Sequence, residues 1–126
     1  MIKKNDKIFV AGHTGLVGSS IVRNLKKKKY TNIITINRSR LDLLEEKKVN
    51  KFLKIQKPKL VIIAAAKVGG IKANNTFRAN FIRENLQIQT NLIHGSHINN
   101  VKNLIFLGSS CVYPKFSKLP IKEDYL

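Results

Sequence analysis

The stretch KIFVAGHTGLVGS, residues 7–19, joins a short apolar run to three evenly spaced glycines. The run stops at Gly12, as a buried strand does before a turn. Gly12, Gly15 and Gly18 form a G-x-x-G-x-x-G pattern, and the residues that follow repeat apolar side chains at helical spacing. Between a strand and a helix, this pattern is typical of a bend whose backbone N–H groups hold a diphosphate. We therefore predict a phosphate-binding bend at residues 12–18, with an ordinary tight turn as the alternative.

The rest of the chain alternates between strand and helix patterns. Predicted strands cover residues 7–11, 32–37, 60–66 and 103–108, and predicted helices cover 16–28, 43–56 and about 77–99. This alternation predicts an α/β fold in which helices cover both faces of a parallel sheet. We expect a partial doubly wound Rossmann sheet with the strand order 3-2-1-4. The loops after the strands then meet at one edge, which brings residues 12–18, 37–42, 64–70 and 108–113 together.

Composition sets the class of protein. A chain of 126 residues with 43% hydrophobic residues forms one domain with its own core. The longest apolar run, Leu60 to Ala66, is too short to cross a bilayer, and no signal-peptide pattern follows the N-terminus. One cysteine cannot form an internal disulfide. We expect a cytoplasmic protein that does not associate with membranes.

The net charge of +17 raises the question of nucleic-acid binding. Most of the 24 basic residues are lysines scattered among Asn and Ile, which AT-rich codons explain without a ligand. The cluster Lys26 to Lys29 falls at a predicted helix C-terminus, where cations suit the helix dipole. No aromatic residues interleave with the lysines as a single-strand platform needs. We expect no specific nucleic-acid partner, although a basic binding module remains an alternative, and the charge should attract anionic metabolites.

The end of the second predicted strand favours one dinucleotide over another. NAD sites usually place an acidic residue there for the ribose hydroxyls. This chain has Arg38, Ser39 and Arg40 instead, and its first acid is Asp42. A guanidinium can hold a 2′-phosphate, so the segment favours NADP, with a solvated basic turn as the alternative.

Polar residues also end the last predicted strand, in LIFLGSSCVYP at residues 104–114. Taken alone, Cys111 reads as a small buried hydrophobe, and Ser109 and Ser110 as groups that satisfy backbone atoms. His94 and His97 lie three residues apart on a predicted helix, but two imidazoles without an acid or thiol do not indicate a metal. We predict no metal site.

Four segments carry a more specific resemblance: FVAGHTGLVGS, AAAKVGGIKANNT, the helix with NLIHGSH, and LIFLGSSCVYPK. Together they resemble the GDP-L-fucose synthase family of extended short-chain dehydrogenase/reductases. The glycine bend is shared by the whole superfamily, whereas AAKVGGI and GSSCVYP are much more particular. The resemblance runs through nearly all of residues 8–122 and covers only the N-terminal part of the family's length. It implies that residues 1–126 are part of an NADP-binding Rossmann domain.

The resemblance implies an NADPH-dependent, homodimeric enzyme that converts GDP-4-keto-6-deoxy-D-mannose to GDP-L-fucose. Ser109 would hydrogen-bond the substrate C4 carbonyl, and Cys111 would be the acid/base for epimerisation at C3 and C5. A tyrosine and a lysine complete the family's reductase set. The substrate cleft would be lined by Lys67, Val68, Gly69 and Gly70. The implied NADP(H) site consists of Gly12, His13, Thr14, Gly15, Leu16, Val17, Gly18, Arg38, Ser39, Arg40, Leu41, Asp42, Ala64, Ala65, Leu107, Gly108, Ser109 and Ser110.

The chain departs from the family in two ways. Thr14 stands where bacterial relatives often carry Arg, which leaves a 2′-phosphate to Arg38 and Arg40. No Tyr-x-x-x-Lys occurs in the sequence. We therefore expect an incomplete piece of a longer enzyme, inactive alone. The alternatives are another sugar-nucleotide epimerase or dehydratase of the same superfamily and a non-enzymatic basic binding module.

Overall fold

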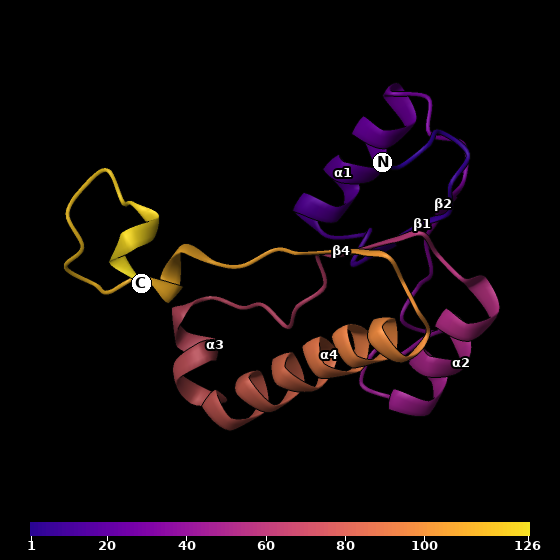
Figure 1. Ribbon diagram of the computed structural model, residues 1–126. Coiled ribbons are helices and arrows are strands. Elements are labelled where there is room, and N and C mark those ends of the chain that lie inside the picture. The colour runs from indigo at the N-terminus through magenta and orange to yellow at the C-terminus, as the bar shows by residue number, and fades with distance from the viewer.

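The computed structural model describes the chain from Met1 to Leu126, except for the surroundings of Ser110 (Figure 1). The predicted α/β alternation is confirmed. Between the predicted strand at 60–66 and the predicted helix at about 77–99, the structure has a further short helix, α3, directly before the long helix α4. Strands and helices follow one another as β1 (Ile8–Ala11), α1 (Leu16–Lys27), β2 (Ile33–Ile34), α2 (Glu46–Gln56), β3 (Leu60–Ile63), α3 (Ile71–Thr76), α4 (Arg78–Ile98) and β4 (Asn103–Phe106), with 3-10 turns η1 (Ser110–Val112) and η2 (Glu123–Tyr125).

Among the described residues, the sheet is parallel and has the order β2-β1-β3-β4. The predicted fold class is confirmed, but the strand order 3-2-1-4 is corrected. β3 pairs along the whole of β1 and does not lie outside β2. The reason is burial: LVII in β3 has no polar residue and is buried at all four positions, so it needs a partner on each side. β2 pairs only Ile33 and Ile34, both half-buried, and forms an edge.

The core lies on both faces of the sheet, because successive side chains of a strand point to opposite faces. One face packs Phe9 and Ile63 against Val49, Leu53 and Leu92 of α2 and α4. On the other face, Ile8, Val10, Leu60 and Ile62 pack against Ile21, Val22 and Leu25 of α1. Figure 1 shows α1 on one side of the strands and α2 and α4 on the other. The predicted covering of both faces by helices is therefore confirmed.

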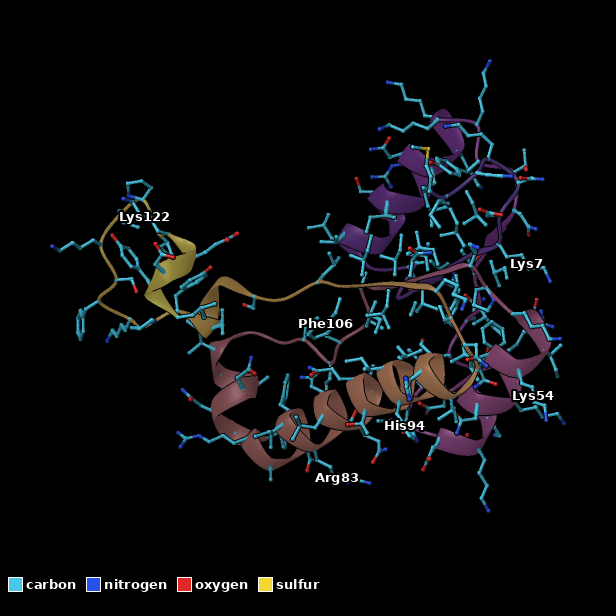
Figure 2. All side chains as sticks on the ribbon, viewed as in Figure 1. Lys7, Lys54, Arg83, His94, Phe106 and Lys122 are labelled. Carbon is cyan, nitrogen blue, oxygen red and sulfur yellow. The ribbon has the colours of Figure 1, made fainter. Side chains whose placement is uncertain are left out.

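Lys7, Lys54 and Lys122 lie on separate parts of the molecule, and Arg83 points outward from α4 (Figure 2). Lys26 and Lys27 occupy the last turn of α1, as predicted from the helix dipole. Within the described part of the chain, no helix is long and apolar enough to cross a membrane.

Candidate dinucleotide site

The glycine bend between β1 and α1 is built by close backbone packing. Gly12 has a φ of +84°, and a Cβ there would lie 2.6 Å from the Ala64 carbonyl oxygen. A Cβ on Gly18 would lie 2.1 Å from the Gly12 carbonyl oxygen. The Gly15 N–H donates to that same oxygen at 3.0 Å and closes the turn. The predicted bend is confirmed, since at Gly12 and Gly18 only glycine fits this path of the chain.

The middle glycine of the three, Gly15, is exposed to solvent. A Cβ on Gly15 would meet nothing closer than 3.4 Å. Gly15 is also the N-cap of α1, and among the described residues no side chain caps this helix and no acid lies in its first turn. The first-turn N–H groups of a helix lack partners within the helix and carry partial positive charge. This end of α1 is therefore suited to an anion, and the phosphate itself stays a prediction.

A cavity of about 600 Å³ opens beside the bend, a volume in the range typical of small-molecule sites. Its walls come from the segments after β1, β2 and β3 and from one face of α4. The sequence predicted the first three segments, because the carboxyl ends of parallel strands share one edge. The lining residues are Phe9, Ala11, Gly12, His13, Thr14, Gly15, Leu16, Val17, Ile36, Asn37, Arg38, Leu41, Asp42, Leu43, Leu44, Ala64, Ala65, Ala66, Lys67, Val68, Glu84 and Ile88.

The cavity brings together most of the predicted cofactor residues, but not all of them. Those inside its lining are Gly12, His13, Thr14, Gly15, Leu16, Val17, Arg38, Leu41, Asp42, Ala64 and Ala65, together with the predicted substrate residues Lys67 and Val68. Those outside it are Gly18, Ser39, Arg40, Gly69, Gly70, Leu107, Gly108, Ser109 and Cys111. Gly18 is buried behind the bend and acts through packing. The predicted cofactor residue Ser110 lies outside the described residues.

Arg38 and Asp42 form an ion pair at the cavity. The Arg38 Nε donates to an Asp42 carboxylate oxygen at 3.3 Å, and the other oxygen accepts the Leu44 N–H at 3.0 Å. The Arg38 side chain is 72% exposed, so the pair adds little stability. The pair orients the guanidinium. Because Asp42 is bonded through Nε, both terminal nitrogens of Arg38 are left to bind an anion.

Several lining residues were not predicted from the sequence, and they come largely from apolar positions and from α4. Leu43 and Leu44 were assigned to a helix that begins only at Glu46. Glu84 and Ile88 lie on α4, far from any strand end in the sequence. A signal for Glu84 did exist: it is the only acidic residue between Glu46 and Glu123. In so basic a chain, an isolated acidic residue indicates an ion pair with a particular basic side chain.

The end of β4 lies at the same edge of the sheet as the bend. Ala11 pairs with Ile63, and Ile63 pairs with Phe106, so the chain leaves β1, β3 and β4 at matching heights. Ser109 and Cys111 are both exposed, and the Ser109 Oγ accepts the Cys111 N–H at 3.2 Å. The sequence alone indicated a buried cysteine, which is wrong. Exposure of the thiol is compatible with the acid/base role that the resemblance implies.

No group of three or more His, Cys, Asp or Glu residues that could hold a metal ion occurs among the residues that the structure describes. The cavity lining combines the backbone of the bend, the Arg38 guanidinium and apolar side chains, features that dinucleotide sites share.

Comparison with known proteins identifies the family. The pattern of the NAD dependent epimerase/dehydratase family matches residues 8–126. The chain belongs to this epimerase/dehydratase family. It is 56% identical over 126 residues to GDP-L-fucose synthase 1 of Arabidopsis thaliana, covering 100% of this chain and 39% of that protein.

Solved structures of epimerase/dehydratase relatives agree with the fold and the cofactor class. A GDP-mannoheptose C4 reductase from Campylobacter jejuni with NADP bound has a TM-score of 0.95 at 45% identity, and the match covers 100% of this chain and 40% of that one. A GDP-L-fucose synthetase from Naegleria fowleri bound to NADP has a TM-score of 0.85 at 26% identity, covering 99% and 37%. The chain therefore spans well under half the length of these relatives, and homologous structures bind NADP.

Proposed function

We propose that this chain supplies the NADPH site of an epimerase/reductase that converts GDP-4-keto-6-deoxy-D-mannose to GDP-L-fucose. The observation that carries the proposal is the position of Arg38 beside the same cavity as the glycine bend. The bend suits a diphosphate, and the guanidinium suits a 2′-phosphate on the ribose of the adenosine that carries this diphosphate. The 56% identity to a plant GDP-L-fucose synthase supports the choice of sugar nucleotide.

Different residues of the cavity would contact different parts of the cofactor. Gly12 to Val17 would hold the diphosphate through backbone N–H groups at the start of α1. Arg38 would hold the 2′-phosphate, with Asp42 fixing its Nε. Leu41, which is 4% exposed, and Ala64 and Ala65 would form apolar walls. When bound, NADPH supplies the hydride that reduces the C4 ketone.

The exposed turn after β4 would serve the sugar. Ser109 would donate a hydrogen bond to the C4 carbonyl oxygen and hold the ketone in place. Cys111 would exchange protons at C3 and C5, positions that the neighbouring ketone makes acidic. Gly69 and Gly70 would line the substrate cleft, and Leu107 to Ser110 would border the nicotinamide. We infer a cytoplasmic homodimer for the whole enzyme from the same resemblance.

A second candidate substrate is a GDP-linked keto-heptose. The Campylobacter jejuni GDP-mannoheptose C4 reductase matches this fold with a TM-score of 0.95. Both candidates share the GDP group, the 4-keto chemistry and the cofactor, and they differ in the sugar. Consumption of NADPH by the whole enzyme with each GDP-4-keto sugar in turn separates them, since the preferred substrate gives the higher kcat/KM.

The cofactor part of the proposal is tested by replacing Arg38 with Ala. We expect NADPH to bind about tenfold more weakly, because a charge-assisted hydrogen bond to the 2′-phosphate is lost. NADH, which has no such phosphate, should bind as before. Calorimetric titration of both dinucleotides measures the difference. Arg83→Ala, which removes an equal charge from the outer face of α4, is the matched control and should change neither affinity.

The affinities of Arg38→Ala for the two dinucleotides can also contradict the proposal. If Arg38→Ala weakens NADPH and NADH to the same degree, or weakens neither, the arginine does not read the 2′-phosphate. The assignment of NADP to this segment would then be wrong, whatever the substrate.

A further inference from the structure

We propose that Asn85 is a positioning residue that fixes the loop after β3 against α4 and so sets one wall of the dinucleotide cavity. The inference rests on the proposed function, because it concerns the same cofactor site. It adds a residue that neither the glycine pattern nor the strand ends pointed to.

Asn85 holds both backbone groups of one loop residue. The Lys67 N–H donates to the Asn85 Oδ1 at 2.7 Å, and the Asn85 Nδ2 donates to the Lys67 carbonyl oxygen at 3.0 Å. A neighbouring strand would make this pair of bonds to a residue within a sheet. The ladder between β1 and β3 ends with the Ala64 N–H donating to the Ala11 carbonyl at 3.0 Å. The Asn85 side chain thus makes to Lys67, three residues after Ala64, the two hydrogen bonds that a neighbouring strand would make.

The side chain of Lys67 is held by the residue next to Asn85. Its ammonium group pairs with the Glu84 carboxylate, and the two side chains are only 31% and 16% exposed. The same ammonium lies 5.4 Å from the centre of the Phe81 ring. Partial burial makes such a pair stronger than a surface ion pair, provided that both partners stay in place. Lys67 is therefore engaged by α4 through its backbone and its charge.

Phe81 packs against the far end of the loop, at Gly69. A Cβ on Gly69 would lie 2.8 Å from the ring carbon Cζ of Phe81, so the loop and the ring are in close contact. Phe81, Glu84, Asn85 and Ile88 are half-buried and share one face of α4, because they recur at helical spacing. We call these four residues the α4 clasp. Ile88 continues this face into the core cluster and the cavity lining.

The position of the clasped loop matters to the cofactor because the loop touches the glycine bend. Ala64 and Ala65 lie within 2.7 Å of where a Cβ on Gly12 would be. Ala64 to Val68 and Gly12 to Val17 line the same cavity. Beyond Ala64 the loop has no further sheet partner among the described residues. Asn74 of α3 donates to the carbonyl oxygens of Gly69 and Gly70, whereas the position of Lys67 depends on α4. Removal of the clasp should let the loop move, and the cavity should lose its fit to the dinucleotide.

The test combines two measurements on the whole enzyme with Asn85→Ala. Amide hydrogen exchange, followed by NMR, reports the Lys67 N–H without any ligand. Titration with NADPH reports the site. We expect the Lys67 amide to exchange at least about tenfold faster and NADPH to bind about tenfold more weakly, because the loop loses two hydrogen bonds. Asn85→Asp keeps an acceptor for the Lys67 N–H but loses the donor, and it should fall between Asn85→Ala and the unchanged chain.

Two control variants separate positioning from general damage. Asn80→Ala removes an exposed amide from the same helix and should leave both measurements unchanged. Leu60→Ala lowers stability through the core on the other face of the sheet, at the end of β3 away from the loop, and should leave NADPH affinity unchanged. A loss of affinity in Leu60→Ala equal to that in Asn85→Ala would assign the effect to stability alone and overturn the proposal.

Each of the remaining outcomes would overturn part of the proposal. If the Lys67 amide keeps its protection in Asn85→Ala, the clasp does not hold the loop and the proposal is wrong. Faster exchange with unchanged NADPH affinity overturns the positioning role. If the unchanged whole enzyme fails to bind NADPH, the proposed function falls and the positioning role falls with it, and the exchange data then still show whether the clasp exists.

Discussion

β1 and β4 each pair in parallel with β3, one on either side, yet their surroundings are opposite, since β1 also pairs with β2 and β4 is the outermost strand of the described sheet. Ile8, Phe9, Val10 and Ala11 of β1 are at most 2% exposed. Leu104, Ile105 and Phe106 of β4 are 36%, 46% and 43% exposed. The bend after β1 is fixed by backbone contacts to its neighbours, whereas the residues after β4 lie in an exposed turn. Both strands point toward the same edge of the sheet, but only one is packed on all sides by described residues.

The difference shows how the two halves of the proposed chemistry depend on the fold. The diphosphate bend needs close backbone approach, which a packed core provides. The Ser109 and Cys111 turn needs reactive side chains that a substrate can reach, and exposure provides that. The first half should therefore be sensitive to changes in packing, and the second should respond to changes in chemistry and hardly to packing.

The strongest test of this contrast compares two residues that pair across the sheet, Ile63 and Phe106. Ile63 is 1% exposed, and replacing it with Ala should lower the free energy of unfolding by about 2–5 kcal/mol through lost contacts and a cavity. Phe106 is 43% exposed, and Phe106→Ala should cost less than about 2 kcal/mol, although the ring is larger. Urea unfolding of both variants measures the costs. Equal costs would show that β4 is packed as tightly as β3.

A smaller effect is expected at the bend. Gly18→Ala places a Cβ 2.1 Å from the Gly12 carbonyl oxygen, so the bend must shift, at a cost of about 1–3 kcal/mol. Weaker NADPH binding should accompany that loss, because the same backbone lines the phosphate site. Gly70→Ala is the control, since a Cβ there meets nothing within 4 Å. Unfolding and titration of the two variants give the comparison, and similar behaviour of both would mean that the bend tolerates side chains.

The sequence predicted the elements better than their arrangement. Apolar runs and glycines located all four strands, because burial and turn geometry act on neighbouring residues. The strand order was wrong, because it depends on which strand needs two partners: the uninterrupted LVII of β3 does, and β2 with two paired residues does not. The strand order depends on which distant strands pair, and the spacing of apolar residues within each strand hardly reports this.

The candidate site follows the same rule. Residues after the ends of strands, such as Gly12 and Arg38, could be located because parallel strands share an edge. Glu84 and Asn85 could not, since their partner Lys67 lies 17 and 18 residues away on another element. Only the isolation of Glu84 among basic residues indicated a partner. Contacts made by a helix face to a loop require the tertiary structure.

The smallest effect on stability is expected at Cys111, and it comes with a large effect on chemistry. Cys111 is exposed, so Cys111→Ser should change the free energy of unfolding by less than about 0.5 kcal/mol. In the whole enzyme, the same change should slow conversion of GDP-4-keto-6-deoxy-D-mannose at least about 100-fold, because the acid/base group for C3 and C5 is lost. Reduction of a ketone that is already epimerised should be largely spared, since hydride transfer at C4 does not use the thiol. Product analysis by chromatography with both substrates measures the two steps. Equal losses in both would place Cys111 outside the epimerisation, and a large loss of stability would show that the turn after β4 is packed after all.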